Sequence, residues 1–424
     1  MVKISVIIPV YNSSNYIKKT INSVYNQSLD DLEVVCVNDG STDNSLEILK
    51  NLNNKYDTLK VISQKNQGPG KARNVGLDAA EGEFVAFLDA DDIFVDNNAL
   101  EKMYKLAIKE NLNVVSANLI FLDKNYKPKT SHHHYESGDY VYFDEYGIID
   151  IKDYGIPYGF TKAIFNLDFL LKNNIKFPTY KTGEDPIFFA KVFVNESKMG
   201  AVPLNLYGYN HTVGGGVNNK INDYGKKKQY LTHFKIVCDI LSSGGLQNIS
   251  DNYKDHLFMY LIWSDNVSDV DLFIIFNELY GDVASDYFDK TNEYYIKFII
   301  SYKFYFLKHS DSNDFFNEVK NEFEKYNVEL IPDIQYITLK RYLLVINSNS
   351  LEEFKSKYNT LILKQLKLEN KSLLNKNKKL NSKNKDLKKD FDKQIKLKKE
   401  LFSSSSWKLT KPIRNSFKLI KKIM

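Results

Sequence analysis

Three aspartates stand together just after a short apolar segment: Asp89, Asp91 and Asp92 follow residues 84–87, which read Phe-Val-Ala-Phe. Such a segment predicts a buried strand, and in an open α/β sheet ligands bind beyond the carboxyl ends of the strands. Carboxylates this close repel one another unless a cation or a hydrogen-bonded sugar compensates them. Because hard oxygen ligands suit Mg²⁺ or Mn²⁺ carrying a diphosphate, the triplet indicates such a site. Aspartates also gather in ordinary turns, so the neighbouring elements decide between the two interpretations.

The residues before the triplet predict strands that alternate with helices. Strands are expected over three segments: residues 4–12, 33–37 and 59–62. An amphipathic helix over 16–27 follows the first strand, a helix capped by Ser41 or Thr42 follows the second, and a third helix begins after Gly-Pro-Gly at 68–70. This alternation predicts a parallel, doubly wound α/β sheet. Its loops bring four charged residues to one rim: Asp39, Arg73, Asp89 and Asp91.

Four segments now stand in a recognisable order and spacing. They are Val-Ile-Ile-Pro-Val-Tyr-Asn at 6–12, Asn-Asp-Gly-Ser-Thr-Asp at 38–43, Ala-Arg-Asn-x-Gly at 72–76 and Phe-Leu-Asp-Ala-Asp-Asp at 87–92. In these segments the chain resembles the family 2 glycosyltransferases over roughly its first half. The resemblance implies the GT-A fold and an inverting enzyme that uses a nucleotide-diphosphate sugar, usually a UDP-sugar.

The resemblance also implies roles at single positions. Five residues would bind the donor: Pro9 and Tyr11 beside the base, Asp39 on the uracil N3–H, Arg73 near the nucleotide, and Asp89 near the ribose or sugar. Asp91 would bind the metal. Other interpretations stay open for three of them: Tyr11 as a core aromatic, Asp39 as the acceptor that stabilises the turn at Gly40, and Arg73 as a solvated helix residue. We expect Asp92 to be a helix N-cap.

Inversion needs one carboxylate that deprotonates the acceptor hydroxyl as it attacks the anomeric carbon. Residues 183–189 read Gly-Glu-Asp-Pro-Ile-Phe-Phe and resemble the Glu-Asp motif that supplies this base in the family. The resemblance implies that Asp185 is the base and that Glu184 supports it or binds the acceptor. In the alternative interpretation both acids simply favour the positive end of the helix that follows.

Residues 206–212, Leu-Tyr-Gly-Tyr-Asn-His-Thr, resemble the segment that closes the family's catalytic domain, usually Tyr-x-Tyr-Arg. Asn210 stands in the position of that Arg, which puts its diphosphate role in doubt. His211 is a candidate metal or β-phosphate ligand, with a structural histidine as the alternative. Glycines 214–216 predict a mobile flap over the donor. The histidines at 132–134 are interpreted as an exposed loop.

The length and composition of the chain predict several domains. A chain of 424 residues implies more than one domain. We expect a glycosyltransferase domain over 1–220, a helical accessory domain over 221–350, a Lys/Asn-rich coiled coil over 351–402 and a basic amphipathic helix over 403–424. Cys36 and Cys238 give no disulfide framework and suit a reducing cytoplasm. We find neither a signal peptide nor an apolar run of membrane-spanning length.

The net charge is +5, but the charged residues are unevenly distributed along the chain. Residues 361–424 carry 20 Lys and Arg against 5 Asp and Glu, whereas the first 360 residues have a net charge of −10. A basic tail suggests an anionic partner, which could be a membrane surface, nucleic acid or a polyanionic glycan, and we favour the membrane surface and expect no nucleic acid. Leucines recur every seven residues from 366 to 387 with Asn at the partner positions, which predicts a dimeric coiled coil or, alternatively, a solvated spacer. Residues 407–422 would form a basic helix at an anionic leaflet.

The sequence therefore predicts an inverting glycosyltransferase that depends on Mn²⁺ or Mg²⁺ and moves a hexosyl or N-acetylhexosaminyl group from a UDP-sugar. Its acceptor would be a surface polysaccharide or a lipid-linked glycan, and its location the inner face of the cell membrane. Two alternatives remain: an inactive membrane-tethered glycan-binding scaffold, and a transferase acting on a protein or teichoic-acid chain. A Rossmann dehydrogenase is excluded, because Gly-x-Gly-x-x-Gly does not follow the first strand.

Overall fold

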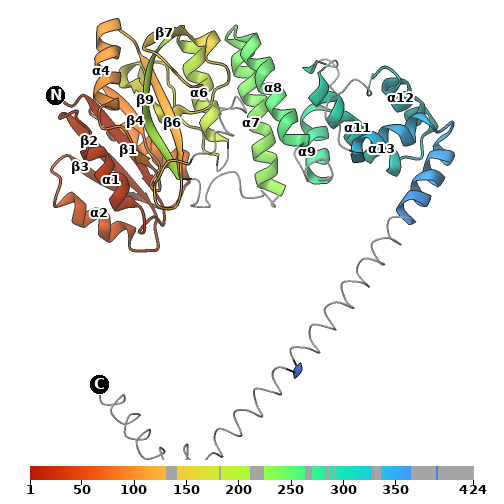
Figure 1. Ribbon diagram of the computed structural model, residues 1–424, viewed down its shortest axis with the longest axis horizontal. Helices are drawn as coiled ribbons and strands as arrows, with labels where there is room; N and C mark the ends of the chain where they lie inside the picture. The colour runs from red at the N-terminus through yellow and green to blue at the C-terminus, as the bar shows by residue number, and fades with distance from the viewer. Residues whose placement is uncertain are drawn as a thin grey trace, which may run out of the picture. The chain divides into compact units, whose positions relative to one another are not determined.

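The computed structural model describes residues 1–129, 141–180, 183–210, 224–262, 270–281, 287–289, 292–326, 328, 336–363 and 388–389. The chain divides into two compact units. The first comprises Met1–Phe306 and Tyr326–Thr338, and the second Leu307–Lys325 and Leu339–Met424. The sheet, whose strands are labelled in Figure 1, belongs to the first unit. All of the predicted site residues that the structure describes also belong to this unit. The boundary predicted at residue 220 stays a prediction.

The first unit is built on one mixed sheet. Its strands are β1 (Ile4–Val10), β2 (Leu32–Asp39), β3 (Leu59–Gln64), β4 (Phe84–Phe87), β5 (Ile93–Phe94), β6 (Val114–Leu122), β7 (Gly147–Asp150), β8 (Ala163–Asn166) and β9 (Lys198–Asn210). They run in the order β3-β2-β1-β4-β8-β6-β9-β5, and β7 pairs with β9. The pairs among β1, β2, β3 and β4 and the pair β6 and β9 are parallel. This mixed sheet confirms the predicted α/β class.

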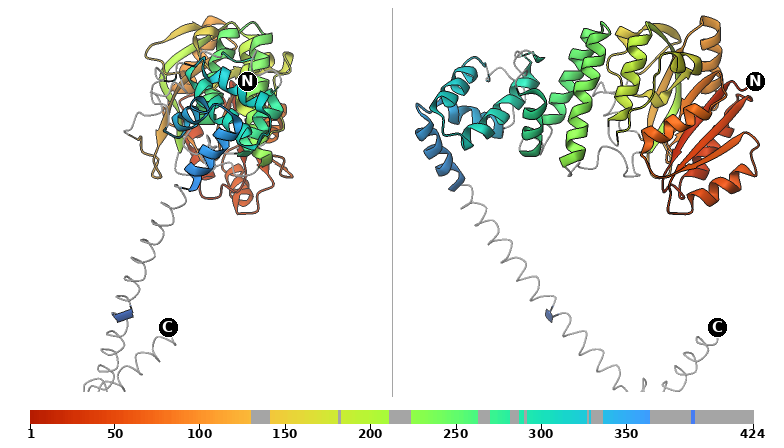
Figure 2. Two further views of the ribbon diagram at one scale, coloured as in Figure 1. Left: turned by 90° about the vertical axis from the view of Figure 1, so that its right-hand side faces the viewer. Right: turned by 180° about the vertical axis from the view of Figure 1, so that it is seen from behind.

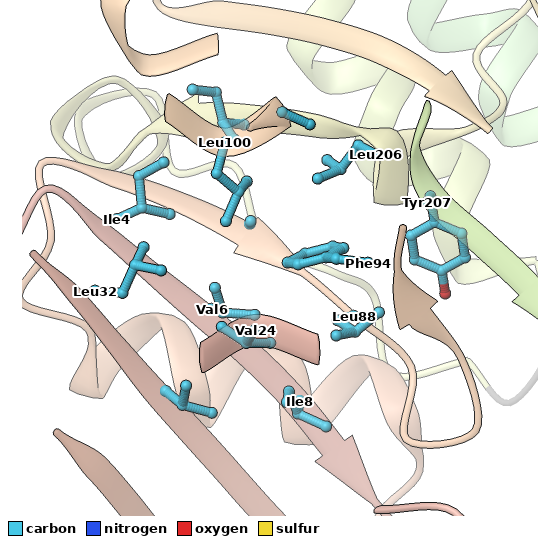
Figure 3. Packing of buried hydrophobic residues seen from close by; sticks show 14 of the residues in the cluster. Ile4, Val6, Ile8, Val24, Leu32, Leu88, Phe94, Leu100, Leu206 and Tyr207 are labelled. Atoms are coloured by element: carbon cyan, nitrogen blue, oxygen red, sulfur yellow. The ribbon is translucent and has the colours of Figure 1, made fainter. Parts of the chain in front are cut away.

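Helices cover both faces of the sheet. The helices are α1 (Ile17–Tyr25), α2 (Ser45–Asn53), α3 (Pro69–Ala79), α4 (Ala99–Glu110), α5 (Leu167–Lys172) and α6 (Glu184–Asn195), with short 3₁₀ turns η1 (Ile151–Asp153) and η2 (Phe160–Lys162). Side chains of β1 alternate between the two faces. Ile4, Val6 and Ile8 join a cluster with Val24 of α1 and Leu100 of α4 (Figure 3). Ile7 faces α3, where a Cβ added at Gly76 would lie 2.3 Å from its Cγ2.

The second half of the chain is helical, as predicted. Its helices are α7 (Tyr224–Ser243), α8 (Gln247–Ile262), α9 (Val270–Tyr280), α11 (Glu293–His309), α12 (Asn313–Phe323) and α13 (Tyr336–Ile346), and residues 351–363 are also helical. Within the first unit α7 packs against α6, α8 and α9 (Figures 1 and 2). Of the helices that the structure describes, none combines the length and the apolar composition that a membrane span requires. Apart from residues 351–363 and 388–389, the predicted coiled coil and the final helix lie outside the described residues.

Asp43 holds the loop that leads into α2, and this corrects one prediction. The helix begins at Ser45 after Asn44, so neither Ser41 nor Thr42 caps it. Instead the Asp43 carboxylate accepts hydrogen bonds from the amides of Ser14 and Ser45, both at 3.0 Å. The loop after β1 is thereby tied to the loop after β2.

We expect Asp43→Asn to lower stability by about 1–2 kcal/mol at pH 7, because it weakens these hydrogen bonds. Partial burial acts to raise the pKa of Asp43, but the bonds from Ser45 and Ser14 outweigh it and lower the pKa from 3.8 to about 2. A lowered pKa contributes stability above the unfolded value, and this is lost as pH falls from about 4 to about 2. Thermal unfolding of both proteins at pH 7 and pH 2.5 should show the difference shrinking in acid. An unchanged difference would contradict the assignment.

Candidate active site

Arg73 on α3 joins three carboxylates that are far apart in the sequence. Its Nη2 lies 2.8 Å from Asp89 Oδ1, and its Nη1 lies 3.2 Å from Glu184 Oε1 and 3.1 Å from Asp185 Oδ1. Asp89 follows β4, whereas Glu184 and Asp185 open α6. Arg73 is 3% exposed, so it is not the solvated helix residue of the alternative interpretation. The predicted donor-side and acceptor-side acids therefore meet at one buried cation.

Aromatic rings and charge hold Arg73 in place. Its guanidinium carbon lies 5.1 Å from the ring centre of Phe160 and 5.3 Å from that of Phe177, within cation–π range. Burial acts to lower the pKa of Arg73, but the charges of Asp89, Asp185 and Glu184 raise it above its ordinary value. The guanidinium thus stays positive in a cluster of three acids.

Asp185 combines exposure with a perturbed environment. Its side chain is 43% exposed, whereas that of Glu184 is 9% exposed. The pKa of Asp185 is raised well above its usual range, first by removal of water around the carboxylate and then by the charge of Glu184, while Arg73 acts to lower it. A carboxylate with a raised pKa is a stronger base than an ordinary aspartate. Glu184 is placed instead as a buried partner of Arg73.

Asn74, beside Arg73, fixes the segment that leads to α6. Its side-chain amide donates to the Phe177 carbonyl at 2.8 Å and accepts from the Phe177 amide at 2.9 Å. Close approach is also needed at Gly70, where an added Cβ would lie 2.6 Å from the Pro178 carbonyl oxygen. The sequence motif contains Asn74, but we predicted no role for it. Because asparagine is unfavourable inside a helix, its presence within α3 could have indicated that its side chain has a specific partner.

The three aspartates after β4 point to different partners. Asp92 is 2% exposed, and it accepts from Tyr207 Oη at 2.5 Å and from the Asn210 amide at 2.6 Å. It therefore anchors the end of β9, and the prediction of a helix N-cap is wrong, since no helix begins there. Asp91 is partly exposed; burial and the charge of Asp89 raise its pKa to about 6. Asp89 turns toward Arg73.

The residues predicted to bind the nucleotide base lie at the ends of β1 and β2. Pro9 pairs with Val37 in the parallel register, and Tyr11, which follows the strand, is 52% exposed, so it is not a core aromatic. Asp39 is buried and accepts from Gln64 Nε2 at 2.7 Å and from the amides of residues 67 and 68, both at 2.8 Å. Asp39 thus holds the loop before α3, and a uracil contact would be additional to these bonds.

β9 ends at Asn210, and the described residues resume at 224. Asn210 is 3% exposed, and its side-chain amide lies 3.5 Å from the Asp91 carbonyl oxygen. Tyr126 donates to the same carbonyl at 3.2 Å and carries Lys19 Nζ 3.5 Å above its ring. His211, the glycines at 214–216 and the histidines at 132–134 lie outside the described residues. Among the residues described, no three His, Cys, Asp or Glu side chains are placed to hold a metal together.

A comparison with protein families matches residues 5–172 to the model of "Glycosyl transferase family 2". A cholesterol galactosyltransferase of Borreliella burgdorferi is 31% identical over 288 residues, which cover 66% of this chain and 76% of that protein. The chain belongs to glycosyl transferase family 2. The matched segment contains Asp39, Arg73 and the three aspartates, but it ends before Glu184 and Asp185.

Other family 2 relatives cover different shares of the chain. The minor teichoic acid biosynthesis protein GgaA of Bacillus subtilis is 28% identical over 345 residues, covering 78% of this chain and 74% of that protein. An uncharacterized glycosyltransferase of Haemophilus influenzae is 41% identical over 121 residues, but the chain covers only 48% of its length. The solved structure of S. aureus TarS residues 1–349 matches with a TM-score of 0.53 at 22% identity, covering 82% of this chain and 90% of that one, and so shares its fold.

The family 2 domain thus brings together most of the predicted residues in two places. Asp89, Arg73, Glu184 and Asp185 are joined by ion pairs. Pro9, Tyr11 and Asp39 lie at the adjoining ends of β1 and β2. Asp91 lies two residues after Asp89, and Asn210 and Tyr126 contact its carbonyl oxygen.

Proposed function

We propose that this chain transfers a hexosyl or N-acetylhexosaminyl group from a UDP-sugar to a hydroxyl of a cell-surface glycan or its lipid-linked precursor, with inversion at the anomeric carbon. The observation that carries the proposal is Arg73, which ties Asp89, the predicted donor-side acid, to Asp185, the predicted base. A base is useful only within reach of the reacting centre. Because Arg73 pairs with both Asp89 and Asp185, the proposed base lies close to the proposed donor site.

The residues suggest one displacement step. The acceptor oxygen forms a bond to the anomeric carbon while the bond between that carbon and the diphosphate oxygen breaks, and UDP leaves with the electron pair. Asp185 takes the proton of the acceptor hydroxyl, and its raised pKa favours that transfer. Arg73 stays charged, orients the Asp185 carboxylate and balances part of the negative charge of the site.

A divalent cation fits the donor chemistry of Asp91. Its carboxylate is the kind of oxygen ligand that Mg²⁺ and Mn²⁺ prefer. Burial and the charge of Asp89 raise the pKa of Asp91, and a bound cation would counter both effects. Since Asp92 is bound to Tyr207 and Asn210, Asp91 is the aspartate that would hold the ion, together with diphosphate oxygens. When bound, such an ion would neutralise charge on the leaving diphosphate.

We expect EDTA, or Asp91→Asn, to reduce turnover at least about 100-fold, because Lewis-acid stabilisation of a leaving group contributes several kcal/mol. Asp91→Asn should also abolish the gain in UDP affinity that Mn²⁺ gives the unmodified protein, as measured by calorimetry. Asp96→Asn is the control, since the Asp96 carboxylate accepts from the Asn98 amide in the following turn. Full activity in EDTA, or normal turnover of Asp91→Asn, would contradict the metal role.

The names of similar proteins support the donor and acceptor classes. TarS has been solved in complex with UDP and with UDP-GlcNAc. GgaA is named for teichoic acid biosynthesis, and a relative from Bacillus spizizenii, 30% identical over 203 residues, is named a poly(ribitol-phosphate) beta-glucosyltransferase. These names favour a polyol-phosphate chain among the acceptors. UDP release with a panel of UDP-sugars, with and without such a chain, tests the function, and no release with any pair would overturn it.

We also propose that residues 361–424, with a net charge of +15, hold the enzyme at an anionic membrane surface, peripheral on its inner face. Each Lys or Arg near such a surface contributes about 1 kcal/mol. Deleting residues 403–424 should reduce binding to anionic vesicles, while transfer to a soluble acceptor stays normal. Binding of the full chain should weaken as salt rises, because exposed charges are screened. Equal binding to neutral vesicles would argue against the proposal.

A further inference from the structure

The imidazole of His233 on α7 lies directly against Gly183, the residue that precedes Glu184 and Asp185. A Cβ added at Gly183 would lie 2.5 Å from His233 Cγ and 2.6 Å from Nδ1. Gly183 has a φ of +79°, a left-handed conformation that side chains disfavour. Both requirements leave only glycine at this position. The ring therefore occupies the space beside the backbone from which α6 starts.

Two tyrosines hold the ring of His233. Its Nε2 lies 2.9 Å from Tyr253 Oη on α8, and the Tyr253 hydroxyl donates to Tyr158 Oη at 3.3 Å. With the Tyr253 hydrogen directed at Tyr158, Nε2 is the donor to Tyr253. His233 and Tyr253 are 1% and 0% exposed. A chain of hydrogen bonds thus runs from Tyr158 in the loop before η2, through Tyr253 on α8, to His233 on α7, whose ring packs against the residue before α6.

His233 does not act through its own charge. Burial lowers its pKa to about 3. The imidazole is consequently neutral at any working pH, and it can neither donate a proton to the nearby acids nor balance them. What it can supply is a fixed surface of defined shape and orientation.

We infer that His233 is a positioning residue for the Glu184–Asp185 pair, and that the tyrosine chain lets α7 and α8 set the position of the base. The inference rests on the proposed function of Asp185. Asp185 lies two residues after Gly183 and 3.1 Å from Arg73, so a shift of the helix start moves the carboxylate directly. Misplacement of a reacting group by about 1 Å can cost about 100-fold in rate.

The test compares His233→Ala and Tyr253→Phe with Leu241→Ala. Leu241 is fully buried on the same helix, about 12 Å further along its axis. At a temperature where all variants are folded, we expect kcat to fall at least 10-fold in His233→Ala and about 3-fold in Tyr253→Phe, with UDP affinity unchanged. In Leu241→Ala only the unfolding temperature should fall. A normal kcat in His233→Ala, or equal losses in His233→Ala and Leu241→Ala, would overturn the inference.

Hydrogen–deuterium exchange separates this inference from the proposed function. The amides of residues 184–190 should exchange faster in His233→Ala than in the unmodified chain, and Leu241→Ala should leave them unchanged. Unchanged exchange in His233→Ala overturns the positioning role whatever the activity. Faster exchange in a chain that releases no UDP with any donor supports the contact and refutes the assigned reaction.

Discussion

Replacement of Asp185 by asparagine should reduce sugar transfer by about 10²- to 10⁴-fold, the contribution that a positioned general base makes. The amide keeps the size of the side chain but accepts no proton. UDP affinity should stay within about two-fold, since the base acts on the acceptor hydroxyl. Steady-state transfer assays and UDP calorimetry on the same preparations give both numbers.

Asp168→Asn is the matched control. Asp168 also lies in the first turn of a helix, α5, and is exposed. If Asp185 only complemented the positive end of its helix, both substitutions would have the same small effect on stability and none on turnover. Loss of UDP binding in proportion to transfer would instead place Asp185 in the donor site and refute its role as base.

Replacement of Arg73 by methionine should lower stability by about 3–5 kcal/mol, because it leaves the buried Glu184 carboxylate without its cation and also removes the partner of the partly exposed Asp89 and Asp185. Transfer should fall below detection, since Asp89 and Asp185 lose the group that joins them. The three acids would then repel one another at neutral pH. Because loss of the cation favours the protonated over the charged carboxylates, the deficit should shrink as pH falls and the carboxylates take up protons. Urea unfolding at pH 5 and pH 8 measures that change.

Lys60→Met controls for loss of a cation away from the site. Lys60 pairs at 2.7 Å with Glu33, whose side chain is 3% exposed, and at 2.8 Å with Glu81. This variant should lose stability while its folded fraction keeps normal turnover. An Arg73→Met protein that transfers sugar at the normal rate would refute the proposed arrangement of the site.

The sequence predicts the central strands well, because a strand that is buried on both faces is an almost continuous run of apolar residues. Segments 4–12 and 33–37 correspond to β1 and β2, and both strands are buried along nearly their whole length. The acids at their ends were recognised for the same reason: a charge that follows such a strand must lie at the rim. Local pattern and tertiary environment agree at these positions.

Contacts between distant segments produce no comparable pattern in the sequence. Arg73 pairs with Asp185 across 112 positions, and Asp92 pairs with the Asn210 amide across 118. Asp92 illustrates the limit, because an aspartate before a predicted helix reads as a cap until β9 is seen to end beside it. Asn74 likewise binds the backbone of Phe177, and His233 packs against Gly183. Both partners are distant in the sequence and are set by tertiary packing.

The separation between Arg73 and its partners has a consequence for the order of folding. Contacts between distant residues form late, since a long loop must close first. A nascent chain of 172 residues contains the whole matched family segment, yet Arg73 then has only Asp89 to pair with, because Glu184 and Asp185 have not been made. Synthesis must pass α6 before the site can assemble. A chain that ends before α6 can therefore form the Arg73–Asp89 pair but not the complete cluster of three acids.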